Sequence, residues 1–301
     1  MALLNPPELR ASMMAVLALY LAQSPGHNDE FQRTIDAVSP PSLSDAPDKH
    51  QLDAVKNLTS MIELGLASRD GDRVHLSPEA TKAARKGHAA IGRVIRGRVL
   101  APELNSAPWG SQEGARDLTN ALAWFLSFGP AAAPARMEGE TPNARDLQEA
   151  DFGRRQGSGD DGGSWPISNG TRWTAFQRWA CSLGFAWRSP SGRLIPDPTP
   201  ALRDSLNDVF GSSSHLEARA FVERVAAHLP VLETGSCRLL VEENWNRAED
   251  QSGDLSVPTS DALRRLEASG ALVFEDRDDS PRVLRDDGTT FSHVARGRQV
   301  R

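Results

Sequence analysis

The sequence predicts a mainly α-helical protein with small β-hairpins, an α+β chain in which one kind of unit is used three times. Apolar residues at helical spacing run into a glycine at Gly65, Gly184 and Gly270. A glycine there can take the left-handed conformation that turns a chain out of a helix. Two short strand-like runs around a polar tip follow each glycine. The repeat length, about a hundred residues, is that of a small domain.

The first unit is predicted to hold three helices before its hairpin. The helix that opens it begins at Asn5-Pro6-Pro7, with proline in its first turn, and ends at Pro25. The second spans about residues 28–38, and the third spans 48–64, where apolar residues recur at helical spacing. The hairpin that follows returns at residues 69–72, and a further helix restarts at Glu79. Three helices followed by a hairpin is the order of a winged helix-turn-helix unit, and we expect this unit to occupy residues 1–103.

The second unit, residues 104–210, repeats the order with a longer middle. We expect helices over 112–128 and 169–183, a short helical piece near 144–150, and a hairpin over 185–195. Residues 151–168 are rich in glycine and predict a flexible loop.

The third unit, residues 211–301, is expected to hold helices over 215–229, from 235, and from 259 to Gly270, then a hairpin over 271–285. Helix, glycine and hairpin are common neighbours in proteins. The alternative is that this local pattern occurs three times in the chain without forming three similar domains.

Composition narrows the classes of function. The net charge is −6, so any nucleic-acid binding must come from local patches instead of an overall positive field. The apolar runs are too short to span a bilayer, so we expect no membrane contact. Two cysteines without partners at ligand spacing fit a reducing cytoplasm, where we place the protein.

The sequence contains no catalytic motif with specific spacing, neither a phosphate-cradling loop nor a nucleophile turn nor a paired-histidine metal motif. The histidines are scattered, and the aspartate pairs at 160–161 and 278–279 lie in turn-like contexts typical of solvated tips. We therefore predict a non-enzymatic protein with no cofactor and no metal.

Candidate nucleic-acid contacts lie on the last helix of a winged unit, which can enter the major groove, and on its hairpin. Lys56 and Asn57 are predicted on the outer face of the first such helix. The second offers Arg172, Thr174, Gln177 and Arg178, with Arg188 and Arg193 on its hairpin. No acid occurs between Thr171 and Ile195, so this unit is the cleanest candidate. The third hairpin is acidic, and we expect it to contact protein instead.

The helix after the first hairpin is the most basic stretch, and we predict nucleic-acid contacts at Lys82, Arg85, Lys86, Arg93 and Arg96. Such a helix can follow a phosphate backbone or an acidic partner. A solvated connector between two units is an equal alternative.

Residues 64–80, 178–199 and 263–277 resemble the tandem winged-helix superfamily. The runs "MALLNPPELRASMMAVLALYL" and "RWTAFQRWACSLGFAW" also resemble an accessory protein of bacterial clusters that insert 7-deazaguanine derivatives into DNA and restrict unmodified DNA. This resemblance implies a role in a DNA-modification or defence system and brings no active site with it.

Two hypotheses follow. In the first, the chain is a DNA-associated adaptor or recognition subunit, and salt-sensitive binding should disappear on Arg172→Ala with Arg178→Ala. In the second, it is a protein–protein scaffold that docks partner enzymes such as an ATPase or helicase without binding DNA. A transcriptional regulator is a third possibility, although regulators usually need one winged unit and a dimer interface.

Overall fold

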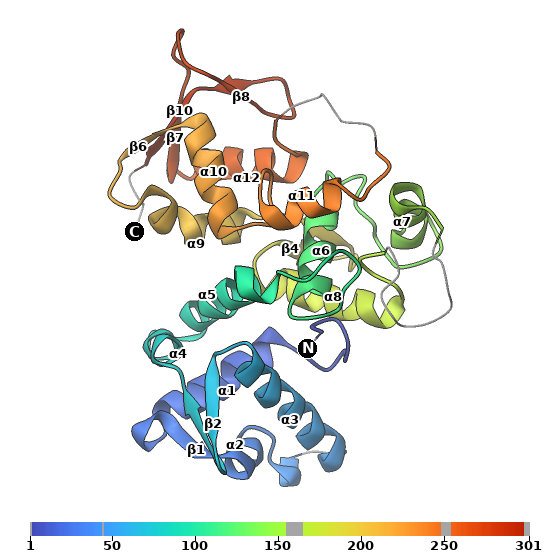
Figure 1. Ribbon diagram of the computed structural model, residues 1–301, viewed down its shortest axis with the longest axis vertical. Helices are drawn as coiled ribbons and strands as arrows, with labels where there is room; N and C mark the ends of the chain where they lie inside the picture. The colour runs from blue at the N-terminus through green and yellow to red at the C-terminus, as the bar shows by residue number, and fades with distance from the viewer. Residues whose placement is uncertain (1, 44, 155–164, 248–253, 298–301) are drawn as a thin grey trace.

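The computed structural model describes residues 2–43, 45–154, 165–247 and 254–297 of the 301-residue chain. Helices dominate, and the strands form small antiparallel sheets, so the predicted α+β class is confirmed. Three groups of elements follow one another along the chain and are stacked in Figure 1, the first at the bottom and the third at the top.

The first group carries a three-stranded sheet beside three helices. Its elements are α1 (Ala11–Gln23), β1 (Asn28–Glu30), α2 (Phe31–Val38), α3 (Pro47–Glu63), β2 (Ala67–Asp70) and β3 (Arg73–Leu76). The strands are ordered β1-β3-β2, and α1 packs against both α2 and α3. Strand β1 occupies the first residues of the region expected to be helical from residue 28.

The basic stretch forms two helices instead of one. These are α4 (Pro78–Ala84) and α5 (His88–Val99), separated at Gly87, whose φ of 104° is incompatible with a continuous helix. Helix α5 packs along α1 and leads from the first group into the second (Figure 1).

The second group has a two-stranded sheet. It contains α6 (Arg116–Phe125), α7 (Ala144–Phe152), α8 (Gly170–Ser182), β4 (Ala186–Arg188) and β5 (Leu194–Pro196). Helix α8 begins at the cap Asn169, whose Oδ1 accepts from the Arg172 amide at 2.9 Å. Most of the predicted glycine-rich loop, and the aspartate pair within it, lie outside the described residues.

The third group repeats the order of the first: helix, strand, helix, helix, strand, strand. It comprises α9 (Thr199–Phe210), β6 (His215–Glu217), α10 (Ala218–His228), α11 (Ser236–Glu242), α12 (Val257–Ala268), β7 (Leu272–Glu275), β8 (Val283–Leu284), β9 (Thr290–Phe291) and β10 (His293–Arg296). Its sheet is ordered β6-β10-β7, which matches β1-β3-β2, with α11 and the β8-β9 hairpin as insertions.

Two details of the third group differ from expectation. Strand β7 pairs with β10, across an intervening 17 residues, and not with residues 283–285, so the predicted 271–285 hairpin is wrong. Helix α9 lies before the expected boundary at residue 211 and packs against α10 and α12, which lie after it.

The glycine that ends the last helix of each group behaves as the sequence predicts. Gly65, Gly184 and Gly270 have φ of 71°, 80° and 71°. After each of them, the next amide donates back to a carbonyl five residues earlier, as in Leu66 to Met61 at 2.9 Å. This pair of features is the Schellman cap, and it directs the chain from helix into strand three times.

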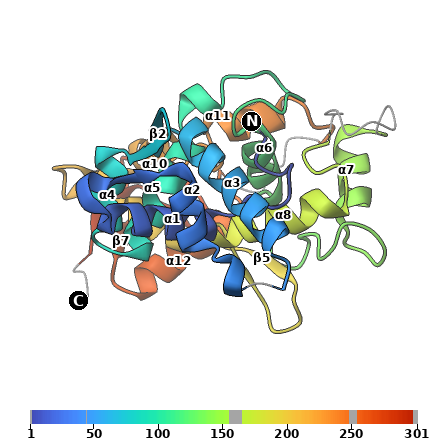
Figure 2. The same ribbon diagram turned by 90° about the horizontal axis from the view of Figure 1, so that it is seen from below.

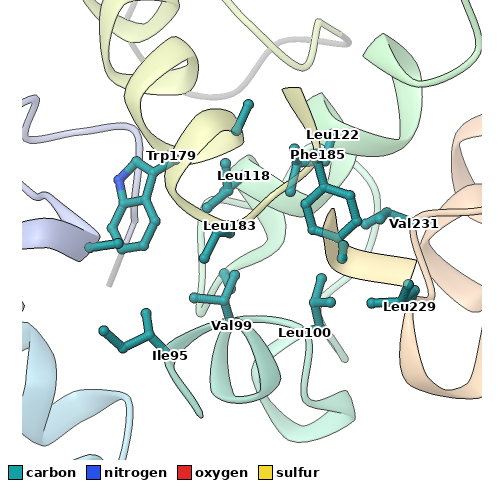
Figure 3. Close-up of a cluster of buried hydrophobic side chains, with 14 of the residues drawn as sticks. Ile95, Val99, Leu100, Leu118, Leu122, Trp179, Leu183, Phe185, Leu229 and Val231 are labelled. Carbon is teal, nitrogen blue, oxygen red and sulfur yellow. The ribbon is translucent and has the colours of Figure 1, made fainter. Parts of the chain in front are cut away.

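A shared core holds the three groups together. Figure 3 shows Val99 and Leu100 from the end of α5 facing Leu118 and Leu122 of α6, with Leu229 and Val231 of the third group beside Phe185. All of these side chains are at most 4% exposed. Burial of each such side chain stabilises the fold by about 1.5–3 kcal/mol, so this junction is a structural centre and not a flexible linker.

The N-terminal segment also joins the groups. The amides of Leu3 and Leu4 donate to Asp117 of α6 at 3.0 and 2.7 Å, so residues 5–7 do not start a helix and α1 begins only at Ala11. Burial raises the pKa of Asp117, and the two amides act in the opposite direction. Helix α1 consequently reaches α8 with its N-terminal end (Figures 1 and 2).

Candidate nucleic-acid interface

An open groove lies between the start of α1 and the unit formed by α8 and β4. We call it the arginine groove and define it by the residues that line it: Arg10, Ser12, Gln177, Arg178, Cys181, Ser182, Ala186, Trp187 and Arg188. It combines residues from the first and second groups. Its existence therefore depends on how these groups pack.

The local sequence explains why α8 presents this face. Trp173, Phe176 and Ala180 are buried, and Trp173 and Phe176 pack with Phe125 of α6 at ring distances of 6.4 and 5.3 Å. At 3.6 residues per turn, Gln177, Cys181 and Arg178 then fall on a neighbouring face of the helix that is only partly buried.

Positive charge accumulates in the arginine groove. Burial lowers the pKa of Arg178, and the neighbouring charges of Arg10 and Arg188 lower this pKa further. Arg10 pairs at 4.0 Å with Asp53, whereas the part of the chain that the structure describes provides no carboxylate partner for Arg178 or Arg188. An anionic ligand would relieve this repulsion.

The guanidinium groups are oriented by neutral partners. Arg178 Nη1 donates to the Pro7 carbonyl at 3.1 Å, and Arg188 Nη2 donates to Gln177 Oε1 at 2.8 Å. Neutral acceptors fix these side chains without cancelling their charge, so each retains other N–H groups for a ligand.

Trp187 gives the groove an aromatic surface. Its side chain is 46% exposed, although indole rings are usually well buried. An exposed indole beside arginines is a combination that binds nucleic acids, because bases stack on the ring while the cations contact the phosphates.

The other residues predicted on α8 and its hairpin lie elsewhere. Arg172 is only 3% exposed and donates to Gln112, so the expectation that it lies on an exposed face is wrong. Thr174 is exposed and donates to the Gly170 carbonyl at 3.0 Å. Arg193 donates to the carbonyls of Ala131 and Ala133 at 2.7 and 2.9 Å, which ties the hairpin to the preceding loop.

Helix α3 does not present the predicted polar face. Asn57 is fully buried, accepts from the Arg10 amide at 2.8 Å and donates to the Glu8 carbonyl at 3.0 Å. Its predicted exposure is therefore wrong. Lys56 pairs with Glu8 at 3.2 Å, so both residues secure the N-terminal segment.

The basic helices divide into two parts. Arg93 and Arg96 of α5 both reach Asp204 of α9, at 3.2 and 3.1 Å, and Arg96 is 7% exposed. The predicted exposure of Arg96 is wrong. Lys82, Arg85 and Lys86 remain exposed and line a second hollow with His27 and His75.

Carboxylates pair with three arginines of α12 and of the segment after β7. Arg264 pairs with Asp261 and Asp287 at 2.8 and 2.7 Å. Arg277 and Arg282 pair in the same way with Glu275 and Asp276, both at 2.7 Å. This surface offers little free positive charge.

Sequence reasoning identified Gln177, Arg178 and Arg188 but missed Arg10 and Trp187. No local sequence pattern marks Arg10 or Trp187 as a ligand-contact residue. Both line the groove because the start of α1 packs beside α8 and β4, more than 160 positions further along the chain.

Within the described ranges, His, Cys, Asp and Glu do not gather in a group that could hold a metal ion. The helices described there are also too short or too polar to cross a bilayer.

The fold and the groove together define an α+β protein with a local cationic surface on an acidic chain. A family model described as DpdG-like matches residues 1–280, and the chain belongs to this DpdG-like family. No curated protein and no solved structure matches it. Membership supports the resemblance to the accessory protein of 7-deazaguanine clusters and connects the chain with a Dpd DNA-modification system.

Proposed function

We propose that the chain is a non-catalytic accessory subunit of a Dpd DNA-modification system and that it binds DNA through the arginine groove. The observation that carries the proposal is the convergence of Arg10, Arg178 and Arg188 beside the exposed Trp187. The absence of a catalytic motif in the sequence supports the non-catalytic role.

We further propose that the first and third groups are winged helix-turn-helix units and that the second is a reduced version. The support is the shared element order and the matching sheets β1-β3-β2 and β6-β10-β7. In such a unit α8 and the β4-β5 hairpin correspond to the helix and wing that contact DNA. One wall of the arginine groove lies on α8 and on strand β4 of this hairpin.

DNA binding is tested with a labelled 20-base-pair duplex and a 20-nucleotide single strand, titrated at two salt concentrations. The variant is Arg178→Gln with Arg188→Gln. We expect an affinity loss of about tenfold or more at low salt, and a smaller slope of log K against log salt, by roughly one unit for each phosphate contact removed. This pair replaces Arg172→Ala, because Arg172 is buried and its loss would disturb the fold.

A matched control separates the groove from general charge. Arg203→Gln with Arg219→Gln removes two exposed arginines of α9 and α10 for which the described residues provide no hydrogen-bond or ion-pair partner. We expect its DNA affinity to stay within about twofold of the original protein. Equal losses in the two double variants would contradict a specific groove.

A protein-docking role is the second candidate, and the third group favours it. Three of its arginines, Arg264, Arg277 and Arg282, are paired with Asp261, Glu275, Asp276 and Asp287. The surface around them therefore suits a partner protein better than a phosphate backbone. No binding of either DNA by the original protein at low salt would leave this scaffold role as the better account.

A further inference from the structure

A second basic hollow lies beyond the C-terminal end of α1, away from the arginine groove at its N-terminal end. It is lined by Gly26, His27, His75, Leu76, Pro78, Thr81, Lys82, Arg85 and Lys86. The lining comes from the turn after α1 (Pro25–His27), from β3, and from α4 with the two residues that follow it. Its ionisable groups are three cations and two imidazoles, and no carboxylate lines it.

Among the described residues, the three cations lack acidic partners, as Arg178 and Arg188 of the arginine groove do. Several other basic side chains of the first hundred residues pair with carboxylates, as Arg33 does with Asp29 and Lys56 with Glu8. For Lys82, Arg85 and Lys86, the described part of the chain contains no ion pair at all. Glu79 shares their helix but does not line the hollow.

Their spacing concentrates the charge. Lys82 lies in α4, Arg85 is the residue that caps its C-terminal end, and Lys86 follows directly. The like charges therefore gather at this end of the helix, where they repel one another. The carbonyl end of a helix offsets at most about half an elementary charge. A large positive excess remains, and it attracts an anion.

One of these cations is held in place by an imidazole. His27 Nδ1 lies 3.0 Å from the Ala22 carbonyl and therefore carries the hydrogen. His27 Nε2 is then an acceptor, and Arg85 Nη2 donates to it at 2.7 Å. The guanidinium consequently keeps its charge and its other N–H groups while its direction is fixed.

The backbone at this point is strained. His27 has φ of 56°, a left-handed conformation that is uncommon outside glycine, and it directly follows Gly26 with φ of 67°. A left-handed conformation of this kind lowers the stability of the folded protein by about as much as the loss of one hydrogen bond. Such conformations cluster at functional sites. It places the His27 ring against Arg85.

We propose that this hollow, formed by His27, His75, Lys82, Arg85 and Lys86, is a phosphate-binding site separate from the arginine groove. Lys82, Arg85 and Lys86 bind the phosphate oxygens, and His27 is a positioning residue for Arg85. The phosphate belongs either to a free nucleotide or to a DNA backbone, since both present the same oxygen atoms to the cations.

The test compares three probes, namely inorganic phosphate, adenosine triphosphate and the 20-base-pair duplex, by calorimetric titration at low salt. The variant Lys82→Gln with Arg85→Gln should weaken at least one probe by about tenfold, since it removes two charge-assisted contacts. The control is again Arg203→Gln with Arg219→Gln, for which we expect less than a twofold change.

His27→Asn tests the positioning role. Asparagine tolerates the left-handed backbone, but its side chain is too short to replace the imidazole against Arg85. We expect a loss of about threefold, smaller than that of the double variant, because the charge of Arg85 remains and only its orientation is freed. An unchanged affinity in His27→Asn would overturn the positioning role.

The outcomes identify the source of the phosphate. Loss of nucleotide or phosphate binding indicates a free ligand, whereas loss restricted to the duplex indicates the DNA backbone. No binding of any probe, or equal binding by Lys82→Gln/Arg85→Gln and the control, would overturn the site. Loss of duplex binding in Arg178→Gln/Arg188→Gln with nucleotide binding intact supports DNA binding by the arginine groove and also shows that the hollow is a separate site.

Discussion

At the scale of single residues, Tyr20 and Asp29 form the polar contact that joins α1 to β1. The Tyr20 hydroxyl donates to Asp29 Oδ2 at 2.7 Å, and Arg33 lies 3.7 Å from the same oxygen. Burial acts to raise the pKa of Asp29, but the Tyr20 hydroxyl, the Glu30 amide and Arg33 outweigh it, so this pKa is lowered. A lowered carboxyl pKa adds stability above the unfolded-state pKa, and that stability is lost as pH falls through the folded-state pKa.

Tyr20→Phe tests this contact. We expect the free energy of unfolding at pH 7 to fall by about 1–2 kcal/mol, because one hydrogen bond to a charged acceptor is removed. At a pH low enough to protonate Asp29 in the folded protein, the difference between the variant and the original protein should shrink. Urea unfolding at pH 7 and at a series of lower pH values, down to protonation of Asp29 in the folded protein, measures both values. A difference that stays constant over the whole series would show that Asp29 is not the charged partner.

Single residues also show where prediction from sequence stops. Helical periodicity correctly places Gln177 and Arg178 on the outer face of α8. It fails for Asn57, Arg96 and Arg172, because each of these polar side chains is covered by another part of the chain and forms hydrogen bonds there. Periodicity describes one helix and carries no information about which neighbour will cover its polar face.

At the scale of elements, the helix caps and the first two hairpins were predictable from the sequence, and the strand pairing of the third group was not. Gly65, Gly184 and Gly270 end their helices as expected, because a left-handed cap depends on a few neighbouring residues. The partner of β7 is β10, which follows two inserted strands. Local sequence predicts that a strand pairs with the next strand along the chain. The pairing of β7 with the more distant β10 becomes clear only in the complete sheet, where β10 lies between β6 and β7.

Two glycines allow a matched test of these elements. Gly65 ends α3 with φ of 71°, and an added Cβ would lie 2.9 Å from Arg98 Nη2. We expect Gly65→Ala to destabilise the protein by about 1–2 kcal/mol, because alanine is disfavoured in the left-handed region. Gly92 lies within α5, where an added Cβ meets nothing within 4 Å.

Gly92→Ala should therefore stabilise the protein by about 0.5–1 kcal/mol, through better helix propensity. Thermal unfolding of both variants beside the original protein checks the opposite signs. A stabilising Gly65→Ala would show that the left-handed cap does not limit the stability of α3.

At the scale of the whole molecule, Arg96 connects all three groups. From α5 it donates to the Leu183 carbonyl at the end of α8 at 3.1 Å and to Asp204 of α9 at 3.1 Å. Burial lowers the pKa of Arg96, while Asp204 opposes this effect and keeps the guanidinium charged. Removing Arg96 would leave the Leu183 carbonyl without this buried donor and Asp204 with only the half-exposed Arg93 as its partner, and both changes are costly.

Arg96→Ala is expected to lower the free energy of unfolding by about 3 kcal/mol and to weaken the coupling between the groups. All seven tryptophans lie between residues 109 and 245, so their fluorescence reports mainly on the second group, whereas circular dichroism reports on the whole chain. The two unfolding curves should coincide in the original protein and separate in the variant.

Arg93→Ala is the control for this measurement. Arg93 contacts the same aspartate, but its side chain is 48% exposed, so its loss should cost at most about 1 kcal/mol. Coincident curves in Arg96→Ala would show that the apolar junction of Figure 3 couples the groups without this residue.

The arginine groove has a consequence for fragments of the chain. Arg10 and Ser12 form one wall, and residues 177–188 form the other. If residues 1–103 and 104–301 were expressed separately, each fragment would contain one wall of the groove, and neither fragment would contain the complete binding surface. DNA affinity restored by mixing the two pieces would therefore measure how well they reassociate.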